Sequence, residues 1–331
     1  METIIIPQHR SNLTDLITPN QISPQRMQPD RAVHFLRHGL LAVILCIACA
    51  VPVMAAPIQL PAIVDPASQE HHVGKLIFVE LVTPDLAAAK KFYAGLFNWT
   101  FRDIQAGGIS YAEAFLDGHP VAGLIHKDIP ASEHRQPAWL SFFAVSDVEA
   151  AKKVALQNAA KVLFEPHSIP DRGREAVFAD PKGAVFAVLA SSSGDPHDVL
   201  AEPGEWIWTS LITSDPDADA AFYQKLFDYE VFELPSSEGH QHLLLASENY
   251  ARASVNTLPA NRPNVRPHWL NYVRVEDTIK MTAKVVALGG RVLVEPRTDR
   301  HGGKVAVVAD PLGAHFGLLE WPETEMKEVP K

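Results

Sequence analysis

The chain repeats itself at a fixed spacing, and this repeat constrains its fold more than any other feature of the sequence. The segment KKFYAGLFNWTF begins at Lys90, and the segment AAFYQKLFDYEVF, which begins at Ala220, carries the same Phe-Tyr-x-x-Leu-Phe pattern 130 residues later. The stretches PAWL and ADPKGAVF recur at the same offset as PHWL and ADPLGAHF. Self-similarity at a fixed period is typical of duplicated structural units. We therefore expect two homologous domains, aligned at an offset of 130 without insertions.

The boundaries of these domains follow from the extent of the repeat and the composition between its copies. The sequence predicts a signal sequence or N-terminal extension (1–56), a linker (57–72), domain 1 (73–191), a second linker (192–203), domain 2 (204–321) and a tail (322–331). The second linker is part of a stretch rich in Ser, Gly, Pro and Asp, which is typical of connecting segments.

Each domain is itself built from two similar halves. The first half opens with the strand pattern LIFVELVT at 76–83, and Asp85 follows as a helix-starting residue. The helix predicted next carries an apolar stripe at helical spacing that includes Tyr93, and three short strand patterns come after it. An aromatic residue in such a stripe usually belongs to the core, and we interpret Tyr93 and its counterpart Tyr223 in this way.

The second half repeats this order. The strand pattern WLSFFAV precedes Asp147, a helix pattern follows, and three further strand patterns end the domain. Each half thus reads β-α-β-β-β, and two such halves can curl their sheets around a shared concavity. We predict an α+β fold: a tandem duplication of paired βαβββ modules, four in all, in which each domain is a curled mixed sheet around a cleft with helices outside.

The N-terminal region has the features of a secretory signal. The apolar run Gly39–Pro57 follows Arg31 and Arg37, and the small-residue pattern Val53-x-Ala55 lies at its end. We expect export to the periplasm or the medium, with cleavage near Ala55. An uncleaved helix that anchors the protein in the membrane is the alternative, and the start codon could be Met1 or Met27.

Charge and cysteine content exclude several kinds of partner and chemistry. The net charge is −10 without a basic block, so we expect no nucleic-acid partner, and we expect membrane contact only through the N-terminal segment. The two cysteines, Cys46 and Cys49, both lie in the apolar run. The exported chain would therefore contain neither a disulfide nor a thiol nucleophile.

The order of these motifs resembles one known superfamily. A strand, a Thr/Val-x-Asp helix start, a helix ending in Phe-Tyr and a closing strand after Asp-Pro-x-Gly resemble the vicinal oxygen chelate proteins, which include glyoxalase I, bleomycin-resistance proteins and extradiol dioxygenases. The resemblance covers about Val73–Trp321. It is strongest to the tandem glyoxalase-like subgroup, in which the first strand reads aromatic-x-Glu-Leu and most biochemical roles are undefined.

The resemblance implies a divalent metal held by side chains on concave strands. At those positions this sequence carries only apolar or aromatic residues and glycine: Phe78, Leu140, Ala187, Trp208, Leu270 and Gly317. Divalent ions need oxygen, nitrogen or thiolate ligands. We therefore expect no metal at this position in either domain, and no other cofactor.

Strand alternation places one carboxylate among the concave residues of domain 1. Side chains two residues apart share a face, so Phe78 and Glu80 should face the cleft together with Phe142 from the next half. Burial would raise the pKa of Glu80 and suit it to proton transfer, which makes it a candidate catalytic residue. Alternatively, Glu80 could accept structural hydrogen bonds. Phe78 and Phe142 are candidate ligand contacts. The nearby loop Pro170–Glu175 reads as a solvated turn.

The same alternation gives domain 2 an aromatic cleft. Trp206, Trp208, Ser210 and Tyr272 are its candidate ligand-binding residues, and His268 and His315 are its candidate catalytic residues. A single histidine on such a face is more often a buried residue with satisfied hydrogen bonds. His240 and His242 could chelate a metal if they lie on a strand, but we favour an exposed hairpin.

Three classes of function remain open. The first is an exported protein that binds a small apolar or aromatic molecule without the superfamily's metal. The second is a metal-independent isomerase or lyase that uses Glu80, or His268 with His315, as a base. The third is a metal-dependent lyase or dioxygenase with displaced ligands. The sequence alone does not identify the ligand.

Overall fold

A computed structural model describes residues 59–106, 108–129, 136–234, 241–259, 265–298 and 302–321. The predicted signal sequence, residue His240 and the C-terminal tail lie outside the described residues. Within the described ranges, no helix is long and apolar enough to cross a membrane.

The first repeat folds into eight strands and two helices in the order that the sequence predicts. Its strands are β1 (Leu76–Thr83), β2 (Thr100–Ala106), β3 (Ile109–Leu116), β4 (His119–His126), β5 (Ala138–Ala144), β6 (Lys161–Ile169), β7 (Gly173–Ala179) and β8 (Val185–Ser191). Helix α1 (Leu86–Phe97) follows β1 and helix α2 (Val148–Gln157) follows β5. Asp85 begins α1, because its carboxylate accepts a hydrogen bond from Ala88 N at 2.9 Å. Asp147 begins α2 in the same way.

The second repeat has the same elements. Its strands are β9 (Trp206–Thr213), β10 (Glu230–Glu233), β11 (His242–Ser247), β12 (Tyr250–Thr257), β13 (His268–Arg274), β14 (Arg291–Thr298), β15 (Lys304–Ala309) and β16 (His315–Glu320). Its helices are α3 (Pro216–Phe227) and α4 (Thr278–Ala287).

Each repeat forms one mixed sheet of eight strands. The first sheet has the order β2-β3-β4-β1-β5-β8-β7-β6, and the second has the order β10-β11-β12-β9-β13-β16-β15-β14. Strand β1 pairs parallel with β4 of its own module and antiparallel with β5, so the two modules of a repeat join at their first strands. The predicted α+β fold of paired βαβββ modules is confirmed. The sheets are not closed into barrels.

The register of the repeat differs from the prediction in one region. Glu80 on β1 pairs with Gly123 on β4, and Ser210 on β9 pairs with Ser254 on β12. Glu80 and Ser210 are 130 residues apart, whereas Gly123 and Ser254 are 131 residues apart. One extra residue therefore precedes β11, and it is compensated before β13. The expectation of a repeat without insertions was wrong here, and His242 on β11 is the counterpart of Tyr111 on β3.

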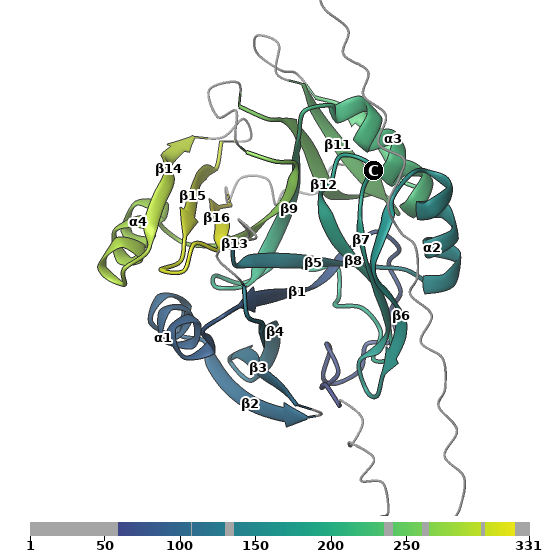
Figure 1. Ribbon diagram of the computed structural model, residues 1–331. Helices are drawn as coiled ribbons and strands as arrows, with labels where there is room; N and C mark the ends of the chain where they lie inside the picture. Colours follow the sequence, from purple (N-terminus) through teal and green to yellow (C-terminus); the bar gives the residue numbers. More distant parts are fainter. Residues whose placement is uncertain are drawn as a thin grey trace, which may run out of the picture. The chain divides into compact units, whose positions relative to one another are not determined.

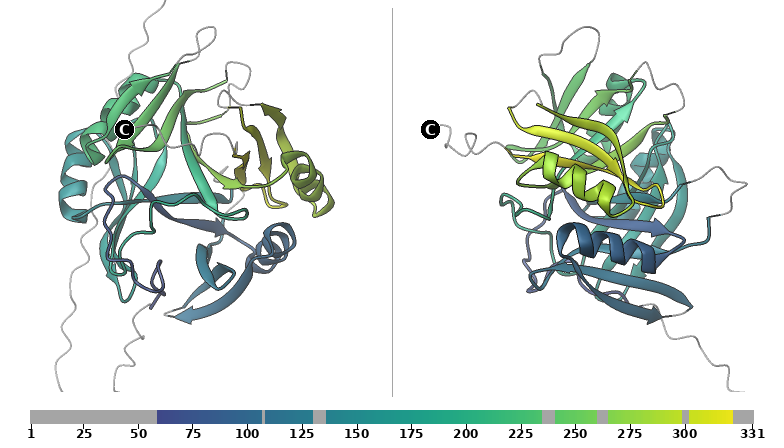
Figure 2. Two further views of the ribbon diagram at one scale, coloured as in Figure 1. Left: turned by 180° about the vertical axis from the view of Figure 1, so that it is seen from behind. Right: turned by 90° about the vertical axis from the view of Figure 1, so that its left-hand side faces the viewer.

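The two largest hydrophobic cores of the described residues form between the repeats. One core joins α1 and β2–β4 of the first repeat to α4, β15 and β16 of the second. The other core joins α2, β5, β7 and β8 of the first repeat to α3, β9, β11 and β12 of the second. Accordingly α1 lies beside α4 and α2 lies beside α3 (Figure 1), and the right-hand view of Figure 2 shows α4 directly above α1. Each repeat thus depends on the other to bury its helices.

The repeated Phe-Tyr motif contributes directly to this interface. The hydroxyl of Tyr93 donates to Asp310 Oδ2 at 3.2 Å, and the hydroxyl of Tyr223 donates to Asp180 Oδ2 at 3.0 Å. Both tyrosines are fully buried, which confirms their interpretation as core residues. Because each contact joins the helix of one repeat to the Asp-Pro-x-Gly turn of the other, the two repeats are related by a pseudo-twofold arrangement.

Candidate functional site in the two clefts

The first cleft is lined by the residues that strand alternation predicts. Phe78 on β1 and Phe142 on β5 are both buried, and their rings meet edge to face with centroids 5.9 Å apart. Phe142 pairs with Ala187 on β8, while Glu80 pairs with Gly123 on one side and Leu140 on the other. The structure therefore brings Phe78, Glu80 and Phe142 to one face.

Glu80 has an environment that favours its protonated form. Burial, with a smaller contribution from the nearby carboxylate of Glu175, raises the pKa of Glu80 to about 7. Arg172 and a hydrogen bond with Tyr111 oppose this shift without cancelling it. Glu80 is thus an acid whose pKa suits proton exchange near neutral pH, as the sequence predicts.

A buried arginine in the first cleft was not expected from the sequence. Arg172 is 1% exposed, and its guanidinium carbon lies 4.3 Å from the centroid of the Phe78 ring. Its Nη2 donates to the Tyr111 hydroxyl at 3.3 Å and lies 3.8 Å from Glu113 Oε1. The loop that carries Arg172 reads as a solvated turn, and for this residue that interpretation was wrong. The local pattern gives no signal that the side chain turns inward.

The guanidinium of Arg172 places a permanent positive charge over Phe78. Phe78 stands at a position where the superfamily resemblance implies a metal ligand, and its phenyl ring offers no donor atom. An internal cation therefore lies among the carboxylates of this cleft. The side chains of the first cleft do not fit a metal ion at this position.

The first cleft is filled by the beginning of the described chain. Residues 59–64, here named the strap, run between β3 and β6 (Figure 1). Leu60 packs against Tyr111 and Ile169, while Ile63 packs against Phe78 and Phe142. A shallow surface depression of about 270 Å³, open to solvent, lies at the end of the strap next to Gln59 and Pro61. Part of the segment predicted as a linker is therefore packed inside the first cleft.

The corresponding face of the second sheet, here called the second cleft, carries a connected set of neutral polar groups. Trp208 Nε1 donates to Ser254 Oγ at 3.2 Å, and the hydroxyls of Ser210 and Ser254 are 2.8 Å apart. Asn256 Nδ2 also donates to Ser254 Oγ, at 3.2 Å. Both serines are buried, and Trp208 is partly exposed. These groups can orient an uncharged ligand against the indole ring.

His242 belongs to the same face. It is the first residue of β11, it is partly buried, and its Nδ1 hydrogen-bonds with the side-chain oxygen of Asn256. The preference for an exposed hairpin was therefore wrong for His242, because the extra residue before β11 brings it onto the strand.

The two candidate catalytic histidines of the second cleft lie together. The rings of His268 on β13 and His315 on β16 are perpendicular, with centroids 4.9 Å apart. His268 Nδ1 is 2.8 Å from the carbonyl oxygen of Arg266, to which it can donate. Burial lowers the pKa of both rings, and the proximity of His268 contributes to lowering that of His315 to about 4. Both imidazoles are consequently neutral at pH 7.

Tyr272 and Trp206 occupy different environments. Tyr272 lies against Gly317, where a Cβ atom would come within 2.0 Å of the tyrosine ring. Trp206 instead packs against Trp139 with ring centroids 4.9 Å apart, and its Nε1 donates to the carbonyl oxygen of Val121 at 3.1 Å. The prediction that Trp206 shares the cleft face was wrong. A register shift between β9 and β13 interrupts the alternation, so Trp206 turns into the core between the repeats.

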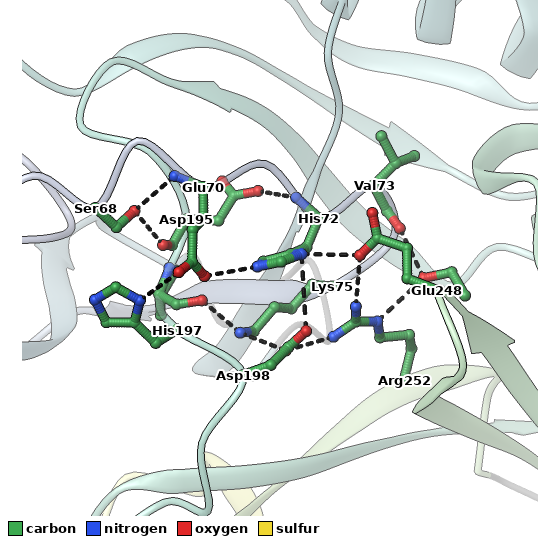
Figure 3. A network of polar contacts seen from close by, with 12 residues as sticks. Ser68, Glu70, His72, Val73, Lys75, Asp195, His197, Asp198, Glu248 and Arg252 are labelled. Carbon is green, nitrogen blue, oxygen red and sulfur yellow. Dashed lines mark hydrogen bonds and ion pairs between the residues drawn. The ribbon is translucent and has the colours of Figure 1, made fainter.

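One group of potential metal ligands occurs among the described residues, and none of its members is a cleft residue named above. Figure 3 shows this group from close by. It consists of His72, Asp198 and Glu248, whose ligand atoms are within 4.8 Å of one another. Lys75 and Arg252 lie 2.7 Å and 2.6 Å from Asp198 Oδ1. Although burial alone would raise it, these two cations lower the pKa of Asp198 to about 2. The group is best described as an ion-pair network.

Comparison with known proteins gives consistent matches. Residues 71–188 match the family model of the Glyoxalase/Bleomycin resistance protein/Dioxygenase superfamily, and residues 208–319 match that of a glyoxalase-like domain. A putative glyoxylase, CFP32, from Mycobacterium tuberculosis is 32% identical over 257 residues, which cover 77% of this chain and 98% of that protein. The anthracycline biosynthesis protein DnrV from Streptomyces peucetius is 32% identical over 264 residues, covering 76% of this chain and 94% of that protein.

Solved structures with the same fold are more distant in sequence. The Mn(II)-bound glyoxalase from Novosphingobium aromaticivorans superposes with a TM-score of 0.55 at 18% identity and covers 78% of this chain and 84% of its own. The 2,3-dioxygenase LapB from Pseudomonas sp. KL28 superposes with a TM-score of 0.54 at 12% identity and covers 78% of this chain and 97% of its own.

Proposed function

The chain belongs to the glyoxalase/bleomycin resistance protein/dioxygenase superfamily, and from this premise we propose that its second cleft binds a small, uncharged aromatic molecule without a metal ion. The observation that carries this proposal is the combination of side chains on one face. Trp208 and Tyr272 offer aromatic surface, while Ser210 and Ser254 offer hydroxyl groups. An aromatic wall with a few fixed polar groups is typical of sites for small organic ligands.

The charge of the cleft supports an uncharged ligand. The hydrogen-bonding groups described on this face are hydroxyls, an amide, an indole, the imidazole of His242 and the imidazoles of His268 and His315, of which the last two are neutral at pH 7. A charged ligand would lose its hydration there without gaining an opposite charge, which costs free energy. Hydroxyl and carbonyl substituents on a ring would instead find donors and acceptors. Two relatives are named as anthracycline biosynthesis proteins, so an uncharged anthracycline without an amino sugar is a suitable first compound in a ligand screen.

The metal-independent part of the proposal rests on the residues at the superfamily's metal positions. In the second cleft these are Trp208, Leu270 and Gly317, none of which has a donor atom for a divalent ion. Elemental analysis of the purified protein should find less than one equivalent of metal per chain. Tightly bound stoichiometric metal that is lost in His268→Ala or His315→Ala would contradict this part, and it would favour the alternative of displaced ligands.

A second function, metal-independent proton transfer, has one observation in its favour. His268 and His315 lie side by side in the same cleft, and both are neutral at pH 7. A pKa of about 4 makes His315 a weak base, so His268, whose Nδ1 can donate to the Arg266 carbonyl, is the better proton acceptor. If the protein is an isomerase or lyase that uses this base, His268→Gln should retain ligand binding and lose turnover, whereas a binding protein would show no turnover in the wild type.

Tryptophan fluorescence tests the binding site directly. A compound that enters the second cleft should quench Trp208, and Trp208→Phe should remove most of the quenching and weaken binding. Trp206→Phe is the matched control, because Trp206 is two residues away on the same strand but faces the core. If Trp206→Phe abolished the signal and Trp208→Phe preserved it, the ligand would bind elsewhere.

Export is proposed on the sequence alone. The apolar run Gly39–Pro57 has the composition of a signal sequence. N-terminal sequencing of the protein recovered from the periplasm or the medium should begin near Ala56. An intact Met1 on protein recovered from the cytoplasm would refute export, and a membrane-bound intact chain would favour the anchor.

A further inference from the structure

We propose that the first cleft is a receptor for an extended apolar peptide, and that the strap, residues 59–64, is its ligand within the same chain. The strap has the sequence QLPAIV. On this proposal the first cleft is closed to small molecules, and the two repeats have diverged so that one binds peptide and the other remains available to a soluble ligand.

Two apolar side chains anchor the strap. Leu60 is 7% exposed and Ile63 is 4% exposed, although both belong to a segment without helix or strand structure. Ile63 packs against Phe78 and Phe142, which are the aromatic residues predicted to line the cleft. A buried anchor in a pocket of aromatic rings is a common means of peptide recognition.

Polar contacts hold the backbone of the strap. Arg172 Nε donates to the carbonyl oxygen of Pro61 at 2.7 Å, and Ser193 Oγ accepts from Val64 N at 3.2 Å. At its first residue, Gln59 Nε2 donates to Asp171 Oδ2 at 2.6 Å. Two of these three contacts involve main-chain atoms, which any peptide can offer. The selectivity of the cleft for one peptide over another therefore depends mainly on the two apolar anchor side chains of the peptide.

Arg172 connects the strap to two aromatic residues of the first cleft. The same guanidinium that donates to Pro61 also donates to Tyr111 and lies over the Phe78 ring. Its counterpart in the second repeat is Gly302, which has no side chain. The second repeat therefore lacks the side chain that donates a hydrogen bond to the backbone of the strap.

The second repeat also lacks the strap itself. The residues that follow the strap by 130 positions are 189–194, and the first three of them form the end of β8 in the first sheet. They are paired with β7 and cannot extend across the second cleft as well. The chain before β9 is the second linker, which begins where β8 ends and therefore connects the two sheets. The asymmetry follows from this order of the chain.

The segment after the strap is fastened to the second linker. Ser68 N donates to the carbonyl oxygen of Ser193 at 3.0 Å, and His72 N donates to Asp195 Oδ2 at 2.6 Å. Figure 3 shows His72 among Glu70, Asp198 and Glu248. This tether keeps the strap near the cleft, and a tethered ligand acts at an effective concentration of about millimolar. A free peptide should therefore bind only when the anchors of the strap are removed.

The experiment uses full-length protein and a labelled synthetic peptide, QLPAIV. In the wild type the cleft is occupied, and we expect no change in the fluorescence anisotropy of the peptide. The double variant Leu60→Ser/Ile63→Ser should bind the peptide at least about tenfold more tightly than the wild type does. A peptide with serine at the two anchor positions should not bind. Val199→Ser is the control variant, because Val199 is a 77% exposed apolar residue of the second linker.

Three results would overturn the proposal. They are equal peptide binding by the wild type and the double variant, no peptide binding by a folded double variant, and equal binding of the serine-substituted peptide. If the double variant does not fold, the milder Ile63→Ala variant provides the same comparison. Binding of a small molecule to the second cleft, read from Trp208, should be unchanged in both variants, so failure here is distinguishable from failure of the proposed function.

Discussion

Replacing Glu80 with glutamine should stabilise the protein at alkaline pH and leave its stability unchanged at acid pH. Glutamine has nearly the shape of the protonated acid, so it occupies the same space opposite Leu140 and removes the possibility of ionisation. The prediction depends on the position of Glu80, which lies on the face of the strap-filled cleft and has a pKa raised to about 7 by burial.

The sign follows from the protons that each state binds. The pKa of Glu80 is about 7 in the folded protein and 4.5 in the unfolded chain. Between these pH values the folded protein holds the proton and the unfolded chain does not. The contribution of Glu80 to the free energy of unfolding is therefore full below pH 4.5, and it is lost as the pH rises through 7. A difference of about 2.5 pKa units corresponds to about 3 kcal/mol at pH 8. Because Glu80 is partly exposed, we expect between about 1 and 3 kcal/mol.

Urea unfolding from pH 4.5 to pH 8.5 measures this difference. The free energy of unfolding of Glu80→Gln should equal that of the wild type at pH 4.5 and exceed it increasingly up to pH 8, with an unchanged m-value. Glu230→Gln, at an exposed carboxylate of β10, is the control and should give a difference near zero at every pH. A Glu80→Gln variant that is less stable than the wild type at pH 8 would refute the reasoning. It would show that ionised Glu80 stabilises the protein by compensating the charge of Arg172.

Three further changes test other parts of the structure. Tyr223→Phe leaves the buried carboxylate of Asp180 without its hydrogen bond from the other repeat, so urea unfolding should show a loss of about 1–3 kcal/mol, and no loss would contradict the role of this contact. Arg172→Met should cost about 1–3 kcal/mol by the same assay, because the Pro61 carbonyl and the buried Tyr111 hydroxyl lose their hydrogen bonds with Arg172 while Glu113 keeps its ion pair with Arg102, and a loss below about 1 kcal/mol would mean that the cation is dispensable. His315 has a folded pKa of about 4, below its ordinary value of 6.5, so it should reduce stability as the pH falls from 6.5 to 4. Urea unfolding of His315→Gln should lack this loss, and an unchanged pH profile would place His315 in a solvated environment.

Much of the fold could be predicted from the sequence, because its signals are local. The apolar stripe of α1 and the position of Asp85 define a helix and its beginning without reference to the rest of the chain. Strand alternation correctly placed Glu80, Trp208 and Tyr272 on the cleft faces, and it brought His268 and His315 to one cleft. The ligand-binding and catalytic roles of these residues remain predictions.

Alternation failed where a strand is irregular. It places Trp206 beside Trp208 only if the pairing of β9 is continuous, and the register shift opposite Tyr272 and Val273 turns Trp206 into the core. A similar limit applies to His242, whose place on β11 depends on one extra residue that the overall repeat conceals.

The duplication, the four βαβββ modules and the apolar nature of the metal positions are all evident in the order of the residues, since they depend on periodicity and residue type. The folded protein was needed to show that the two largest cores form between the repeats, that Arg172 turns into the first cleft and that the strap fills it. These features join residues that are far apart in the chain, such as Pro61 with Arg172 and Tyr93 with Asp310. Which distant surfaces meet depends on the packing and solvation of the whole fold, and a local pattern carries no record of its distant partner.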